Sequence, residues 1–160
     1  MKIPGIVIAA SASGSGKTAV TMAMMKAFKN TGKKVRACKC GPDYIDGLFH
    51  RKVLGIEGGN LDSFFERPED MRKKLMNISK DHFPVIEGVM GYFDGLGGDT
   101  TAASSWEVAD ILDLPVVLVV DAKGMGRSVI PLIAGFLAYD KAHLIRGVIF
   151  NRMSAAYYEI

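Results

Sequence analysis

Six residues near the start of the chain have the composition of a loop that binds nucleotide phosphates. Their sequence is Ser13-Gly14-Ser15-Gly16-Lys17-Thr18, and they follow an apolar run at 5–10. Backbone N–H groups in such a loop converge on phosphate oxygens, the lysine reaches the β- and γ-phosphates, and the threonine hydroxyl coordinates Mg²⁺. The usual pattern has an additional first glycine, which is Ser11 here, so phosphate binding depends on Gly14, Gly16 and the start of the following helix. We therefore predict a site for ATP, or a close relative, with Mg²⁺.

Charged residues end two further runs that are predicted to be strands. Lys39 ends the run at 34–39, and Glu87 ends the run at 83–87. In open α/β sheets, ligands bind at the carboxyl ends of the strands. Phosphate-loop enzymes place an acid there that holds Mg²⁺ directly or through water. We predict that Glu87 has this role and that Lys39 lies at the same edge of the sheet.

Four more carboxylates follow these runs at positions that suit a ligand site. Asp43 and Asp46 come after Lys39, and Asp62 follows a pair of glycines. Asp94 lies in a loop at 88–101 that contains five glycines. Aspartate is also a favoured turn residue, so the pair after Lys39 fits a turn as well, and Asp62 is either a metal ligand or a turn former. Asp94 is placed to act beyond the γ-phosphate of a nucleotide.

The elements that must position these residues alternate along the chain. Short, largely apolar runs predict strands at 5–10, 83–87, 115–120 and 144–150, and the segment at 34–39 is predicted to be a second strand between the first two of them. Helical patterns between them predict helices at 17–30, at 68–80, from Thr101 or Ser104 to 112, and at 127–139, with a short helix inside 44–54. This alternation predicts an α/β fold of the phosphate-loop NTPase type, with a doubly wound, mostly parallel sheet and helices on both faces.

Composition narrows the class of protein further. The chain has 160 residues, 49% of them hydrophobic, which predicts a single domain over 1–160. The net charge is +3 with no lysine-rich block, which does not support a nucleic-acid surface. The sequence contains no run of about 18 apolar residues, which is the length that would predict a membrane span. We therefore expect a cytoplasmic protein. Cys38 and Cys40 fit small, buried apolar residues. Among the histidines, His50 alone is a candidate for lining the site, and His82 and His143 are expected at the surface.

Taken together, the motifs resemble those of the cobyrinic acid a,c-diamide synthases. The resemblance rests on Gly-Pro-Asp-Tyr-Ile-Asp at 41–46, Asn-Leu-Asp at 60–62, Glu-Gly-Val-Met-Gly-Tyr-Phe-Asp-Gly at 87–95 and Val-Val-Leu-Val-Val-Asp-Ala-Lys-Gly-Met at 116–125. These motifs cover nearly the whole chain in order. The chain is more distantly similar to the dethiobiotin synthetases.

The resemblance implies that ATP phosphorylates an acetate carboxylate of cobyrinic acid or a related tetrapyrrole, and that ammonia then forms the amide. It implies that Lys17 and Lys39 neutralise the phosphoryl group, that Thr18, Asp62 and Glu87 hold Mg²⁺, and that Asn151 contacts adenine. Asp43 and Asp46 would lie near the substrate carboxylates, and Asp94 would help to activate one of them. Members of this family also carry a C-terminal glutaminase domain, which we do not find here, and the family and its relatives suggest a homodimer.

Four alternatives remain open from the sequence. The same motifs suit amidation of nickel-sirohydrochlorin, because they recognise ATP and carboxylates more clearly than the ring. A dethiobiotin-type carboxylase is disfavoured by the loop at 41–46. A partitioning-type ATPase switch would usually carry a second lysine early in the phosphate loop, and residues 9–13 contain none. The fourth is a remnant that binds nucleotide without catalysis.

Overall fold

A single parallel sheet forms the centre of the computed structural model, which describes residues 3–42 and 51–157. Its six strands lie in the order β3-β2-β4-β1-β5-β6, and every neighbouring pair is parallel. The strands are β1 (Ile6–Ala10), β2 (Val35–Cys40), β3 (Asn60–Leu61), β4 (Phe83–Glu87), β5 (Val116–Asp121) and β6 (Ile145–Asn151). The predicted parallel α/β architecture is thereby confirmed, and all strand carboxyl ends lie at one edge.

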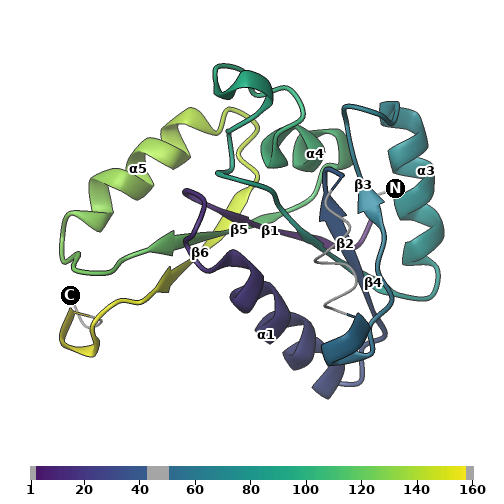
Figure 1. Cartoon of the computed structure of the whole chain (residues 1–160), viewed down its shortest axis with the longest axis horizontal. Coiled ribbons are helices and arrows are strands. Elements are labelled where there is room, and N and C mark those ends of the chain that lie inside the picture. Colours follow the sequence, from purple (N-terminus) through teal and green to yellow (C-terminus); the bar gives the residue numbers. More distant parts are fainter. Residues whose placement is uncertain (1–2, 43–50, 158–160) are drawn as a thin grey trace.

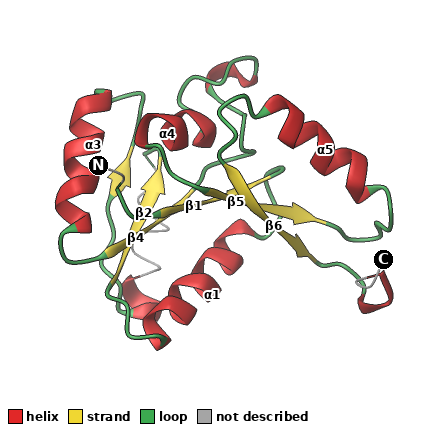
Figure 2. Cartoon of the chain, turned by 180° about the vertical axis from the view of Figure 1, so that it is seen from behind, coloured by secondary structure: helices red, strands yellow, loops and turns green. Residues whose placement is uncertain are grey.

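Helices cover both faces of this sheet (Figures 1 and 2). The longer helices within residues 3–42 and 51–157 are α1 (Lys17–Asn30), α3 (Pro68–Ser79), α4 (Ser105–Leu112) and α5 (Val129–Tyr139). Helix α1 lies on one face together with the helical residues 51–54, and α3, α4 and α5 lie on the other. Alternation along β1 explains the two layers, because successive side chains of a strand point to opposite faces. Val7 and Ala9 belong to the core under α3–α5, and Ile8 and Ala10 pack with Met25 of α1.

The predicted boundaries agree with the structure to within about two residues at most ends. Pro131 falls in the first turn of α5, where proline is tolerated. Strand β3 was not predicted, because two residues are too short to show a periodicity. The long glycine loop contains a short 3₁₀ turn, Leu96–Gly98.

Residues 43–50, which include Asp43, Asp46 and His50, lie outside the described residues, and 51–54 are helical.

No helix in the described residues is both long and apolar enough to cross a membrane. Of the two histidines expected at the surface, His143 is exposed, and His82 is partly buried.

Cys38 and Cys40 are buried side by side on one face of β2, as predicted. Both are free thiols, and burial raises the pKa of each to about 12 from an ordinary value of 9.0. An unfolded thiol loses its proton above pH 9, whereas the folded one keeps it. The unfolded state therefore binds fewer protons in this range, and stability falls as the pH rises.

We expect the free energy of unfolding to fall above pH 9 by about 1 kcal/mol per pH unit for each of the two thiols. Urea denaturation between pH 8 and pH 10 measures this slope. The double variant Cys38→Ala/Cys40→Ala should lose most of it. An equal slope in the double variant would show that other groups cause the loss of stability at high pH.

Candidate active site

The phosphate loop lies between the end of β1 and the start of α1, in the strand–loop–helix context that its chemistry requires. Gly14 and Gly16 have φ angles of 77° and 85°, in the left-handed region that favours glycine. The Ser15 side chain is buried and donates a 2.8 Å hydrogen bond to the Ala12 carbonyl. Helix α1 begins at Lys17, and its first turn contains no acidic residue. The N-terminus of α1 therefore presents its partial positive charge to the loop.

Three predicted site residues, Thr18, Lys39 and Glu87, meet at the carboxyl ends of the central strands. Thr18 Oγ1 donates to Glu87 Oε1 at 2.6 Å, and Lys39 Nζ donates to the same oxygen at 3.2 Å. Lys39 and Glu87 are opposite each other in the β2–β4 register. Their side chains are 6% and 0% exposed, so each offsets the cost of burying the other's charge. The structure thus joins the phosphate loop to the acid predicted on β4.

The donor atoms here fit a divalent cation held together with a nucleotide. Mg²⁺ usually takes one or two carboxylates and completes its shell with phosphates and water, and Thr18 and Glu87 supply a hydroxyl and a carboxylate side by side. Asp62 is 7% exposed, and its Oδ2 is buried with no hydrogen-bond partner among the described residues. Strand β2 separates it from Glu87 in the sheet. The described residues contain no cluster of three or more His, Cys, Asp or Glu side chains suited to a metal.

The end of the last strand contacts the phosphate loop from the other side. Asn151 Nδ2 donates to the Ser15 carbonyl at 2.8 Å, and Arg152 donates to the Gly14 carbonyl. An ion pair of 3.1 Å joins Arg152 to Asp121 at the end of β5. A Cβ added at Gly16 would lie 2.2 Å from Asn151 Nδ2. Adenine contact by Asn151 stays a prediction, and in this structure its amide holds the loop.

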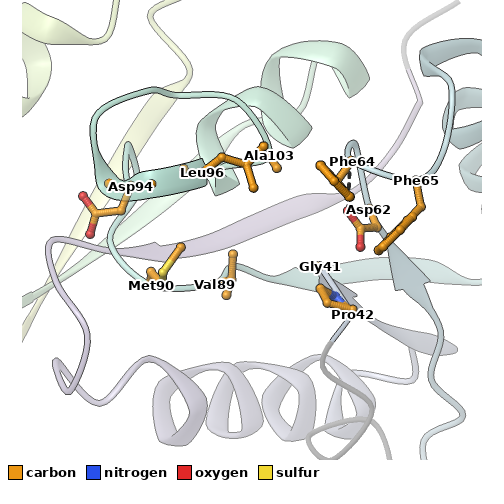
Figure 3. A pocket seen from close by; sticks show the side chains of 13 residues that line it. Gly41, Pro42, Asp62, Phe64, Phe65, Val89, Met90, Asp94, Leu96 and Ala103 are labelled. Carbon is orange, nitrogen blue, oxygen red and sulfur yellow. Dashed lines mark hydrogen bonds between the residues drawn. The ribbon is translucent and has the colours of Figure 1, made fainter.

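A cavity of about 850 Å³ lies over the carboxyl ends of β2, β3 and β4 (Figure 3). Asp62, Phe64 and Phe65 lie on one side of it, and Asp94 lies on the other. Asp94 is exposed, and its Oδ2 accepts a 3.0 Å hydrogen bond from the Gly91 backbone N–H. The rest of the lining comes from the segments after β2 and β4 and from the glycine loop: Gly41, Pro42, Val89, Met90, Gly95, Leu96, Gly97, Gly98 and Ala103.

One side chain, Glu107 on α4, links the two walls of this cavity. Its Oε2 accepts from Ser63 Oγ at 2.6 Å and from the Ala103 backbone N–H at 2.7 Å. Ser63 belongs to the turn after β3, and Ala103 lies between the glycine loop and α4. The Glu107 backbone N–H donates to Ser104 Oγ, which is half of a capping box. The carboxylate thus ties together two loops that are distant in the sequence.

Replacing Glu107 with Ala should loosen both walls together. Each lost hydrogen bond to a charged group is worth about 1.5–3 kcal/mol. We therefore expect amide hydrogen exchange to rise about tenfold or more at 62–66 and at 95–103, with little change at 11–16. Glu107→Gln keeps an acceptor oxygen and should show a smaller rise, and Asp110→Ala on the exposed face of α4 should show none. Unchanged exchange in both walls of Glu107→Ala would contradict this linkage.

Sequence reasoning missed several residues around the site. The Ser104-x-x-Glu107 spacing is a capping-box signal that pointed to Glu107, but nothing in the sequence pointed to Ser63 as its partner. Asp121 and Arg152 follow the strand-end rule that was applied to Lys39 and Glu87, and were overlooked. Phe64 and Phe65 carried no signal, because exposed aromatic residues resemble core residues in a sequence.

Comparison with known proteins identifies the family. The model described as "CobQ/CobB/MinD/ParA nucleotide binding domain" matches residues 6–159. The chain belongs to this family. The nucleotide binding named in the description of this family agrees with the geometry of the phosphate loop. The curated relatives described next confirm the predicted resemblance to the a,c-diamide synthases.

The relatives are a,c-diamide synthases from several bacteria. The chain is 43% identical over 152 residues to "Cobyrinate a,c-diamide synthase" of Listeria innocua, covering 94% of this chain and 34% of that protein. It is 42% identical over 158 residues to "Hydrogenobyrinate a,c-diamide synthase" of Streptomyces coelicolor, covering 98% of this chain and 32% of that protein. The chain therefore spans about a third of the length of the curated relatives it matches.

Solved structures with low sequence identity confirm the fold alone. FlhF complexed with GMPPNP and Mg²⁺ matches with a TM-score of 0.61 and 13% identity, over 94% of this chain and 56% of that one. The signal recognition particle receptor FtsY from Elizabethkingia anophelis matches with a TM-score of 0.60 and 17% identity, over 86% of this chain and 47% of that one.

Proposed function

We propose that this chain binds Mg-ATP and activates acetate carboxylates of cobyrinic acid or a related tetrapyrrole for amidation. The observation that carries the proposal is the Thr18–Glu87–Lys39 contact, which lies at the sheet edge near a cavity whose lining includes Asp62 and Asp94. The names of the relatives support the substrate class. They favour this reading over amidation of nickel-sirohydrochlorin and over a partitioning-type ATPase switch.

The proposed reaction has two steps. A carboxylate oxygen of the substrate attacks the γ-phosphorus of ATP, which gives an acyl phosphate and ADP. Ammonia then attacks the acyl carbon, phosphate leaves with the carboxylate oxygen, and the nitrogen loses a proton. A free carboxylate reacts poorly with ammonia, so the first step supplies the leaving group. Negative charge on the transferring phosphoryl group is the main barrier that the protein must lower.

We assign roles to the described residues accordingly. The backbone of Ser13–Thr18 would hold the phosphates, with Lys17 and Lys39 neutralising the charge of the phosphoryl group. Thr18 and Glu87 would hold Mg²⁺, which supplies charge stabilisation when bound, with Asp62 as a further ligand. Asp94 would help to activate the substrate carboxylate, and Asn151 would contact adenine. The resemblance adds Asp43 and Asp46 near the substrate carboxylates.

The source of ammonia lies outside the described site. A thiol nucleophile needs a lowered pKa and access to its substrate, whereas Cys38 and Cys40 are buried with raised pKa values. These cysteines are therefore unsuited to glutamine hydrolysis. We propose that ammonia comes from a glutaminase domain or from solution, and that the protein works in the cytoplasm, as a homodimer, without nucleic acid or membrane partners.

Mass spectrometry of the reaction mixture tests this function. The chain is mixed with Mg-ATP, ammonium and either cobyrinic acid or hydrogenobyrinic acid, and the products are examined for one or two acid-to-amide conversions. Amide formation that requires ATP is the expected result. Product from nickel-sirohydrochlorin but not from the corrinoids would reassign the substrate. ATPase activity stimulated by DNA, with no amide from any tetrapyrrole, would refute the synthetase.

A further inference from the structure

Two neighbouring phenylalanines in the cavity wall are exposed to an extent that core packing does not explain. Phe64 and Phe65 are 57% and 73% exposed. Their rings meet edge to face, with centroids 4.8 Å apart, and both line the cavity next to Asp62 (Figure 3). Met90 and Leu96, also in the lining, are 43% and 48% exposed. Clustered apolar exposure of this kind marks a contact surface.

The turn that carries the two rings is held by its own hydrogen bonds. Asp62 Oδ1 accepts from the Phe64 backbone N–H at 2.9 Å, and the Asp62 carbonyl accepts from the Glu66 N–H at 2.8 Å. Lys74 pairs with Glu66 at 3.1 Å, and Ser63 is tied to Glu107. The rings are thus presented in a preorganised position, which lowers the entropic cost of binding an apolar partner.

The placement of this pair matches one part of the proposed substrate. A tetrapyrrole has a large ring with acid side chains at its edge. When one acid reaches the phosphoryl site at Thr18, Lys39 and Glu87, the ring must lie in the space over the strand ends. That space has a cavity of about 850 Å³ with these aromatic side chains in its wall, within the size range of small-molecule sites.

We propose that Phe64 and Phe65 contact the face of the tetrapyrrole ring and determine affinity for it. This inference rests on the proposed function. Aromatic rings bind flat conjugated or apolar faces through buried area and through edge or stacked contacts. Asp94 is left to act on the charged edge of the substrate, and Asp62 keeps its proposed role as a ligand of Mg²⁺.

Binding measurements on the 160-residue chain test this assignment. The variants are Phe64→Ala/Phe65→Ala and Phe64→Leu/Phe65→Leu, and the matched control is Tyr139→Ala. Tyr139 is 61% exposed and meets Phe93 edge to face at 4.8 Å, outside the cavity lining. The readouts are Kd for hydrogenobyrinic acid by fluorescence titration and Kd for a fluorescent ATP analogue.

We expect the double alanine variant to bind the tetrapyrrole at least about tenfold more weakly, with nucleotide affinity unchanged. The double leucine variant keeps the apolar bulk and should lose less. Tyr139→Ala should behave like the unaltered chain. Phe64→Trp should retain binding, and its added indole fluorescence should be quenched when the tetrapyrrole binds.

Three outcomes would overturn the assignment, and they differ in their consequence for the proposed function. Equal tetrapyrrole affinity in the unaltered chain and the double alanine variant refutes the aromatic contact alone. Parallel loss of nucleotide binding shows that the pair is structural. Failure of the unaltered chain to bind any tetrapyrrole, while it binds nucleotide, removes the proposed substrate and this inference with it.

Discussion

Glu87→Gln should lower the rate of ATP-dependent amide formation about a thousandfold, the size of effect seen when a preorganised charge-stabilising group is removed. Glu87 Oε1 accepts from both Thr18 and Lys39, so the neutral amide alters the charge balance of the whole contact. The carboxylate also supplies the proposed Mg²⁺ ligand on β4. Steady-state assays of ADP release and of amide formation measure the effect.

Loss of folding must be separated from loss of chemistry, because Glu87 is fully buried. Removing one partner of a buried ion pair costs about 3–5 kcal/mol, but glutamine keeps the shape and one acceptor oxygen. Circular dichroism and thermal melting should show a folded Glu87→Gln. The matched control is Glu57→Gln, which breaks the pair with Arg36 on β2 at a side chain that is 71% exposed. Full turnover in Glu87→Gln would refute its role.

Gly16→Ala should weaken nucleotide binding about a hundredfold, because even a displacement of about 1 Å in a site has effects of this order. An added Cβ would lie 2.2 Å from Asn151 Nδ2. Either the Asn151 side chain must turn away or the loop must move, and in both cases the Ser15 carbonyl loses its partner. Titration with a fluorescent ATP analogue measures the change.

The control for backbone strain is Gly32→Ala, just after the opposite end of α1. Gly16 and Gly32 have φ angles of 85° and 83°, but a Cβ at Gly32 would meet no atom within 4 Å. Both variants should lose about 1–2 kcal/mol of stability from the left-handed conformation, and only Gly16→Ala should lose nucleotide affinity. The double variant Gly16→Ala/Asn151→Ala should recover part of that affinity. Equal nucleotide affinity in Gly16→Ala and Gly32→Ala would refute the clash.

The residues that could be predicted are those whose position follows from strand ends. Lys39 and Glu87 each close a predicted strand, and a parallel sheet brings strand ends to one edge, so their place at a shared edge follows from the topology. Lys17 and Thr18 follow from the local phosphate-loop pattern in the same way. The contact between Lys39 and Glu87 depends in addition on strand order, because β2 and β4 are neighbours in the sheet.

The contacts that could not be predicted depend on side-chain direction across long sequence separations. Asn151 was expected near the nucleotide, but its hydrogen bond to Ser15 depends on how β6 ends. Ser63 meets Glu107 only because α3 and α4 pack on the same face of the sheet. The exposed pair Phe64 and Phe65 follows a two-residue strand that leaves no periodic signal.

Oxygen transfer from the substrate carboxylate to phosphate is the most direct test of the central claim, the formation of an acyl phosphate. The tetrapyrrole is labelled with ¹⁸O in its carboxylates and incubated with the chain, Mg-ATP and ammonium, and the released phosphate is analysed by mass spectrometry. Our account predicts one ¹⁸O atom in each phosphate that accompanies an amide. Phosphate without the label, released while ADP accumulates, would contradict it, because water and not the carboxylate would then have accepted the phosphoryl group.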